Sequence, residues 1–250
     1  HLAQSHRVET FAYDWRQPLD VLAERFGEFV DRLLKDTTQP VRLLAHSMGG
    51  LVVRACIHKR RAVMDALMAR DGARLVMLGT PHQGAYSMVE NLLGKGSTLR
   101  SLVRLDAKHD MQQVLDLVAG YRGPLALLPK PRFVDTFQGE PEGGEPHALD
   151  RADTWAAFKP RVRDAWFGDG RCATPAQDVL DAAGWLWQQD GLDRPALPPE
   201  YANRSAYVHG QAANTPCGVR EQGGTLKMVG TTRGDGTVSW ASGRIEHVDG

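Results

Sequence analysis

The sequence predicts an α/β domain built on a mostly parallel sheet with helices on both faces, and two observations predict it. Short apolar runs alternate along the chain with stretches whose apolar residues recur at helical spacing, which is the pattern of a right-handed parallel sheet. The composition is that of a folded globular protein, because 42% of the residues are hydrophobic and 24% are charged. A chain of 250 residues is long enough for one such domain with a full core.

The first third of the chain supplies the alternating elements in order. Residues 8–15 are rich in β-branched and aromatic side chains and are predicted as a strand. Apolar residues at helical spacing predict a helix over 19–35. An apolar strand at 41–45, of the kind found in a sheet covered on both faces, precedes a helix over 48–60. A further apolar strand is predicted at 73–79.

A different pattern occupies residues 84–203, which we interpret as a mainly helical cap inserted into a single domain. Amphipathic helical pieces are predicted at about 98–119 and 176–189, between loops rich in Gly and Pro. After the cap, one strand is predicted at 206–210, where the chain re-enters the sheet, and another at 225–230.

The cap holds four of the six tryptophans, which are Trp155, Trp166, Trp185 and Trp187. They are expected either to form an acyl-binding wall, which would suit a lipidic substrate, or to pack the cap helices against the sheet. Packing is the slightly favoured interpretation.

Charge and cysteine content argue against several classes of protein. Lys plus Arg and Asp plus Glu both number 30, so no net charge steers the chain to nucleic acid or an anionic membrane. No signal peptide and no apolar run long enough to span a bilayer are present, which slightly favours a soluble, cytoplasmic protein. The three cysteines fit no metal spacing. Cys56 is expected in the core, and a Cys172–Cys217 disulfide is possible but has no support in the sequence.

The clearest functional motif is the run Ala45-His46-Ser47-Met48-Gly49-Gly50. It follows an apolar strand and opens a helix, and such a sharp turn lifts a nucleophilic serine above the sheet edge. Ala45 and Gly49 meet the need for small residues two positions either side of Ser47. The backbone N–H of Met48, at the helix N-terminus, can donate to a developing oxyanion. The alternative is a chance match, but the strand-then-helix context favours a nucleophile.

A serine nucleophile needs a histidine base and a carboxylate that orients the histidine. Asp235, in a Gly-Asp-Gly-Thr-Val loop after a predicted strand, is the expected acid. An ordinary Asp-Gly turn is the alternative interpretation. Three acids in the cap fit less well, and these are Asp150, Asp153 and Asp190.

The base is expected to follow the acid in the chain, and only His247 does so. The few residues before His247 leave hardly any room for the strand that normally precedes the base. We therefore expect the catalytic histidine to lie beyond Gly250 and keep His247 as the alternative. His82 and His209 sit near predicted strand ends, where they either line the site or are structural.

Five motifs occur in a recognisable order: Tyr13-Asp14-Trp15-Arg16, the run 45–50, Gly79-Thr80-Pro81-His82-Gln83-Gly84, Leu125-Ala126-Leu127-Leu128-Pro129 and Gly234-Asp235-Gly236-Thr237-Val238. Together they resemble the lipase-like α/β hydrolases related to lecithin–cholesterol acyltransferase. The resemblance implies the α/β-hydrolase fold, with Ser47 and Asp235 as catalytic residues. The family's first oxyanion-hole donor and its histidine have no counterpart here, which predicts a fragment that lacks both ends of the domain.

The sequence thus predicts a serine carboxylic ester hydrolase, a lipase or esterase, that acts through an acyl-enzyme on an apolar or lipidic ester. No metal or organic cofactor is needed for this chemistry. An acyltransferase would use the same residues. A catalytically inactive binding module of a larger protein is the alternative from another class. The sequence specifies neither the individual ester nor the oligomeric state, and the fragment itself is not required to be active.

Overall fold

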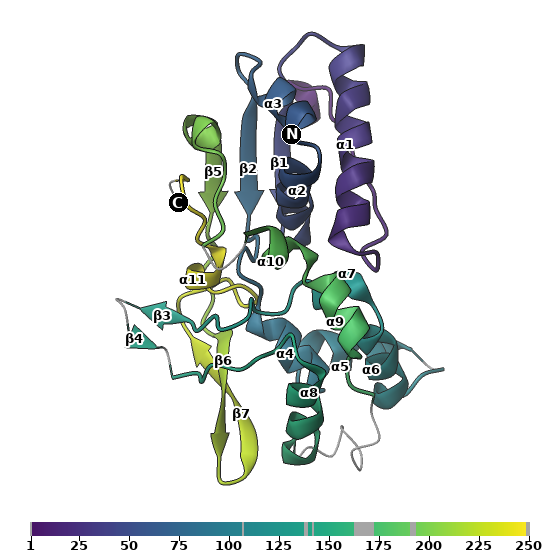
Figure 1. Cartoon of the computed structure of the whole chain (residues 1–250), viewed down its shortest axis with the longest axis vertical. Helices are drawn as coiled ribbons and strands as arrows, with labels where there is room; N and C mark the ends of the chain where they lie inside the picture. The colour runs from purple at the N-terminus through teal and green to yellow at the C-terminus, as the bar shows by residue number, and fades with distance from the viewer. Residues whose placement is uncertain are drawn as a thin grey trace.

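The computed structural model of the chain describes residues 2–106, 108–137, 140–141, 143–162, 173–190 and 194–248. It is a mixed α/β structure with a small parallel sheet at one end and most of the helices of the insertion at the other (Figure 1). Among the described residues, no helix has both the length and the apolar character needed to cross a membrane.

The parallel sheet has three strands in the order β1, β2, β5, and these are Arg42–His46, Arg74–Leu78 and Ser205–Val208. Their register aligns His46 with Leu78 and Leu78 with Val208. The three carboxyl ends are therefore level, and the residues that follow them emerge at one edge of the sheet. All three strands were expected from their apolar composition, and β1 and β2 are confirmed to within one residue.

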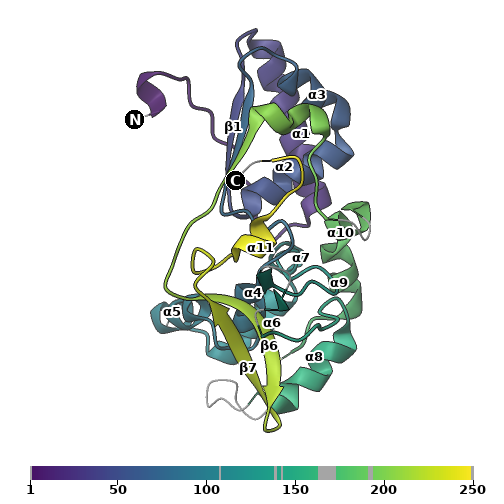
Figure 2. The same ribbon diagram turned by 90° about the vertical axis from the view of Figure 1, so that its left-hand side faces the viewer.

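Three helices pack on one face of this sheet, and these are α1 (Leu19–Asp36), α2 (Met48–Lys59) and α3 (Arg61–Met68) (Figure 2). The opposite face carries Leu44 and Val208, which are 59% and 49% exposed. The expectation of helices on both faces was therefore wrong for the described residues. The connection from β2 to β5 runs through the long insertion, and its helices lie beyond the end of the sheet and not over its second face (Figure 1).

The segment from 8 to 15 is not a strand, contrary to its composition. It pairs with no strand among the described residues, and an extended segment becomes a strand only when its backbone finds a partner. Aromatic packing holds it instead, because the Phe11 ring lies 5.1 Å from that of Phe26 and 5.4 Å from that of Phe29 on α1. Arg16 donates two hydrogen bonds to the Asp14 carboxylate, at 2.8 and 2.9 Å.

The described part of residues 84–203 contains several helices, and they are shorter than predicted. They are α4 (Tyr86–Leu92), α5 (Ser97–Leu105), α6 (Met111–Ala119), α7 (Arg122–Leu125), α8 (Ala152–Phe158), α9 (Gln177–Ala183) and α10 (Trp185–Asp190). The stretch predicted as one helix over 98–119 is two, because Asp110 caps α6 and forms a capping box with Gln113. Short pieces complete it: 3-10 helices at Lys159–Arg161 and Pro199–Arg204, and the β3–β4 pair at Thr136–Phe137 and Glu140–Pro141.

An antiparallel hairpin follows the sheet, formed by β6 (Thr215–Gln222) and β7 (Thr225–Thr231). Its turn is Gly223-Gly224, both at positive φ, which glycine adopts without steric cost. The strand predicted at 225–230 is therefore confirmed as a strand, in a sheet of its own. The short helix α11 (Trp240–Gly243) comes after the hairpin.

The tryptophans and cysteines that the sequence analysis singled out differ in their surroundings. Trp155 is 3% exposed and donates to the Leu149 carbonyl at 2.9 Å, so it packs in the core as a structural residue. Trp187 is also buried but lines a cavity. Cys56 is fully buried, and burial raises its pKa to about 12, as expected of an inert core thiol. Trp166 and Cys172 lie outside the described residues.

Candidate active site

Ser47 sits in a strained turn between β1 and α2. Its backbone has φ 51° and ψ −125°, one of three positive φ values at described residues other than glycine. Residues other than glycine rarely adopt this backbone conformation, because it costs of order 1–3 kcal/mol. Residues that do adopt it cluster at functional sites. The turn is held by two hydrogen bonds, from Ser47 N to the Leu78 carbonyl at 2.9 Å and from Gly50 N to the Ser47 carbonyl at 3.1 Å. The half-buried serine thus projects from the level ends of β1 and β2.

The close approach that demands a glycine lies at Gly50. A Cβ atom there would fall 2.6 Å from Cγ2 and 2.8 Å from Cβ of Thr80, which is fully buried. At Gly49 a Cβ atom would meet only ordinary contacts, at 3.9 Å from Ala45 and 4.0 Å from the Tyr13 hydroxyl. The sequence motif therefore identified the right turn but assigned the tight contact to the wrong glycine.

This difference gives a matched pair of stability predictions. Gly50→Ala is expected to destabilise the fold by about 1–3 kcal/mol, because the buried Thr80 cannot move away. Gly49→Ala is expected to leave stability unchanged or raise it by about 0.5–1 kcal/mol, the usual advantage of Ala over Gly in a helix. Urea unfolding followed by circular dichroism measures both. Equal effects of the two substitutions would contradict this assignment of the contact.

Met48 is the first residue of α2. A backbone N–H at that position has no acceptor within its own helix and points towards the N-terminal end. The helix dipole adds positive potential at the same place. The position of Met48 is compatible with a role for its N–H as donor to an anionic oxygen beside Ser47, which stays a prediction.

Asp235 lies in the loop between β7 and α11, where its own backbone contacts fix its side chain. Oδ1 accepts hydrogen bonds from the backbone N–H groups of Thr237 and Val238, at 2.8 and 2.7 Å. Its other carboxylate oxygen points at the end of β2, since a Cβ atom built on Gly79 would lie 2.7 Å from Oδ2. One oxygen is thus held by the loop, and the second faces the sheet edge.

The structure brings Asp235 and Ser47 to the same edge of the sheet. Ser47, Gly79 and His209 directly follow the three register-matched strand ends, and neighbouring strands lie about 4.8 Å apart. Asp235 touches the middle one of these positions, Gly79, and also Gly210 beyond β5. Two of the predicted catalytic residues therefore converge, with a gap between their side chains that a histidine ring would have to bridge.

None of the described histidines is hydrogen-bonded to Ser47. The ring of His247 donates from Nδ1 to the Leu197 carbonyl at 2.9 Å. Its neighbours Glu246 and Val248 line a cavity at the end of β5, the strand furthest from β1. The structure does not bring His247 to Ser47 or Asp235. His209 is close enough to Asp235 to feel its charge. Burial and Arg244 lower the pKa of His209 below 6.5, and the negative charge of Asp235 partly opposes this shift.

A buried ion pair two turns along α2 was not found by sequence reasoning. Arg54 donates from Nη2 to both oxygens of Asp190, each at 2.6 Å, and the two side chains are 1% and 3% exposed. His58 lies 3.3 Å from the same carboxylate. Asp190, considered as a poor candidate for the acid, instead ties α10 of the insertion to the helix that begins at Ser47. Spacing along the sequence gave no sign of this pair, which joins residues 136 positions apart.

Comparison with known proteins shows which family the chain resembles. A profile of the family described as Lecithin:cholesterol acyltransferase matches residues 3–133, more than half of the chain. The match contains Ser47 and Met48 and ends before Asp235 and His247. A comparison with curated proteins finds no significant match. The family is one of lipid-modifying enzymes with acyltransferase or esterase-type activity. On a match that begins before α1 and ends after α7, the chain belongs to the lecithin:cholesterol acyltransferase family.

Proposed function

We propose that this protein is a serine carboxylic ester hydrolase and that Ser47 is its nucleophile. The observation that carries the proposal is the backbone of Ser47, which holds a strained positive φ at a strand-to-helix turn within the part of the chain that matches the family. Such strain is retained where it serves function. A serine raised on this turn is the defining feature of the nucleophile elbow.

The proposal includes the α/β-hydrolase fold, in a single domain with residues 84–203 as its cap. Three parallel strands with crossover helices support it, as does the family match. The buried pair of Arg54 and Asp190 also supports it, because a cap that shares a buried ion pair with α2 is part of the same folded unit.

In the proposed mechanism, Ser47 Oγ attacks the ester carbonyl while a histidine takes its proton, and the N–H of Met48 donates to the oxyanion. The histidine then protonates the leaving alcohol, and an acyl-Ser47 ester remains. Water attacks this ester with the same histidine as base, which releases the acid and restores the serine. Asp235 orients the histidine through Oδ2, the oxygen that its own loop leaves available. No described histidine is hydrogen-bonded to Ser47. The proposal therefore assigns the base to a histidine that the structure does not describe, and His247 is the alternative.

The substrate is proposed to be an apolar or lipidic ester, in keeping with the lipid-modifying family. The same family match favours a second candidate, an acyltransferase, in which an alcohol replaces water in the second step. Measuring how the acyl group divides between water and an added alcohol discriminates the two. A hydrolase keeps releasing free acid, and an acyltransferase forms mainly the new ester.

Covalent labelling by a fluorophosphonate probe tests the nucleophile directly. The full-length protein is expected to take up about one probe per chain at Ser47, because only an activated serine reacts readily with this reagent. Ser47→Ala should abolish labelling, and Ser101→Ala, at an exposed serine on α5, should leave it unchanged. A folded protein that takes up no probe would instead favour a binding module without catalysis.

A further inference from the structure

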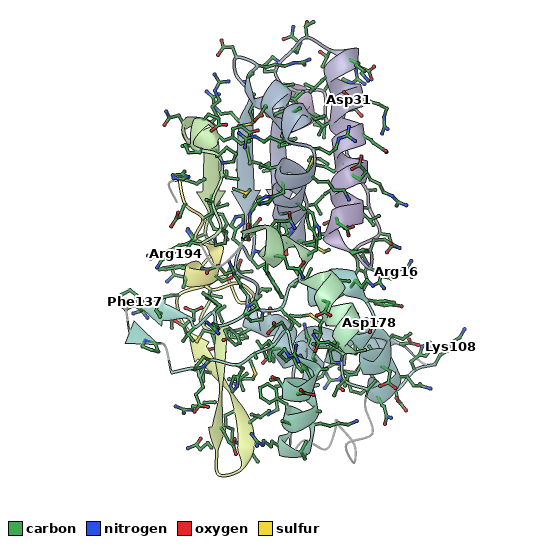
Figure 3. The ribbon with its side chains drawn as sticks, in the orientation of Figure 1. Arg16, Asp31, Lys108, Phe137, Asp178 and Arg194 are labelled. Atoms are coloured by element: carbon green, nitrogen blue, oxygen red, sulfur yellow. The ribbon has the colours of Figure 1, made fainter. Side chains whose placement is uncertain are left out.

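Two cavities adjoin at the cap and share two arginines. The larger, of about 720 Å³, lies between the loop 130–136, the helices α9 and α10, and α11. The smaller, of about 330 Å³, lies against the end of β5. Arg194 and Arg244 line both, and Figure 3 shows Arg194 beside α11, on the side of the molecule that also carries Phe137. The two side chains therefore stand where one hollow passes into the other.

These arginines lack counterions among the described residues. Arg194, Arg244 and a third arginine of the larger cavity, Arg132, are exposed, and no described side chain forms an ion pair or hydrogen bond with them. Elsewhere in the described part of the chain, Arg54 and Arg61 both pair with carboxylates. Cations that line a hollow without partners concentrate positive potential and attract anions.

The other walls of the larger cavity are partly apolar. Phe133, Leu180 and Trp187 contribute to them, and Leu180 and Trp187 are otherwise buried. Of the two carboxylates in the lining, Asp181 already accepts a hydrogen bond from Gln177 at 2.8 Å. A ligand that fits such a lining has an apolar part and an anionic group, since apolar walls with a few placed charges are typical of small-molecule sites.

The smaller cavity leads towards the candidate acid. It is lined by His209 and Tyr207 at the end of β5, and Asp235 and Arg244 act on the pKa of His209 in opposite directions. The helix α11, which precedes Arg244, is fixed by a hydrogen bond from Gln83 Nε2 to the Ala241 carbonyl at 3.0 Å. Arg244, which directly follows α11, is thus held next to the edge where Ser47 and Asp235 converge, and Arg194 reaches the same cavity from the segment that precedes β5.

We propose that Arg194 and Arg244 form an anion site that holds the phosphate or carboxylate group of an acyl ester, so that the preferred substrate is an anionic lipid. The inference rests on the proposed function, whose reaction it leaves unchanged. Guanidinium groups bind such anions through paired, charge-assisted hydrogen bonds. Arg132 adds positive charge to the lining of the larger cavity, and the apolar walls receive the hydrophobic part of the ligand.

Calorimetric titration with short-chain lipids below their micelle concentrations tests the site. Dioctanoyl phosphatidic acid is expected to bind at least about tenfold more tightly than dioctanoylglycerol or dioctanoyl phosphatidylcholine, because only the first carries an unshielded anion. Inorganic phosphate should bind more weakly than the phosphatidic acid, since it lacks the apolar part. Equal binding of the three lipids, or phosphate binding as tight as that of phosphatidic acid, would overturn the proposal.

Substitutions locate the site. Arg194→Gln and Arg244→Gln are each expected to weaken phosphatidic acid binding about tenfold or more, the usual loss for a hydrogen bond to a charged group. Arg32→Gln, at an exposed arginine on α1 away from both cavities, is the matched control and should change nothing. Binding unaffected by both cavity substitutions would contradict the assignment.

Binding also separates this inference from the proposed function. Ser47→Ala keeps the cavity and should bind the anionic lipid as the parent does. If Ser47 takes up no fluorophosphonate but the arginine variants lose lipid, the reaction is wrong and the site stands. If Ser47 is labelled but the arginine variants bind normally, the reaction stands and the anion site is refuted.

Discussion

Replacing Ser47 by alanine is expected to lower kcat for a short p-nitrophenyl ester roughly a million-fold in the full-length protein, as loss of an activated serine nucleophile does elsewhere. The substitution removes one oxygen from a half-buried side chain, so the fold should persist, and circular dichroism checks this. A variant that keeps more than a few per cent of the parental kcat would exclude Ser47 as the nucleophile.

A substitution at Asp235 tests the same mechanism, because the members of a catalytic triad act as a unit. Asp235→Asn is expected to lower kcat about ten-thousand-fold, since the amide cannot orient the base as the carboxylate does. Asparagine can keep the Oδ1 acceptor for Thr237 and Val238, so the loop should survive the change. The double variant with Ser47→Ala should be no slower than Ser47→Ala alone, and Asp153→Ala, at an exposed residue of the cap, should be silent. Independent, multiplying losses would contradict a shared mechanism.

The parts of the fold that sequence predicts well are those whose structure depends on neighbours along the chain. β1, α2 and β2 follow from apolar runs and helical spacing, and the turn at Ser47 follows from the small residues around it. The segment 8–15 has the composition of a strand, but a strand also needs a hydrogen-bonded partner, and local composition cannot supply one. β6 was missed for a related reason, because its run of Pro, Cys and Gly has no alternation that marks a strand.

The candidate site divides in the same way. Ser47 and Asp235 each sit in a short motif, so a single sequence is enough to propose both as site residues. Arg194 and Arg244 are 50 positions apart and sit in no motif, and only the fold brings them to one cavity wall. Their significance is that they lack partners, which is a property of the surroundings and not of the residue type.

The ion pair of Arg54 with Asp190 carries the largest predicted effect on stability. Both charges are withdrawn from water, and the guanidinium also donates to the His82 carbonyl at 3.1 Å. A pair of this kind contributes little compared with apolar residues of the same volume, but removal of one partner leaves a buried charge that nothing compensates. Replacing one partner is therefore expected to destabilise the fold more than replacing both.

Asp190→Asn is accordingly expected to lower the free energy of unfolding by about 3–5 kcal/mol, measured by urea denaturation at pH 7. Removing both charges, in Arg54→Met with Asp190→Leu, should restore most of the loss. Asp31→Asn is the matched control, because Asp31 pairs with Lys35 in an exposed bridge of 2.6 Å, and such bridges contribute about 0–1 kcal/mol. A double variant as unstable as the single one would show that packing, and not the unpaired charge, is responsible.

The pH dependence of that difference follows from the pKa of Asp190. Burial raises this pKa, but the hydrogen bond from His58 and the charge and hydrogen bonds of Arg54 together hold it below 3.8. A carboxyl group whose pKa is lower in the folded than in the unfolded state stabilises the fold fully above the unfolded value, and this contribution is lost as pH falls through the folded value. The stability difference between the parent and Asp190→Asn should therefore be constant from pH 5 to about 7 and shrink below about pH 4. A difference that persists at low pH would mean that the loss of stability in Asp190→Asn does not come from the charge of this carboxylate, and that the contact between α10 and α2 does not depend on that charge.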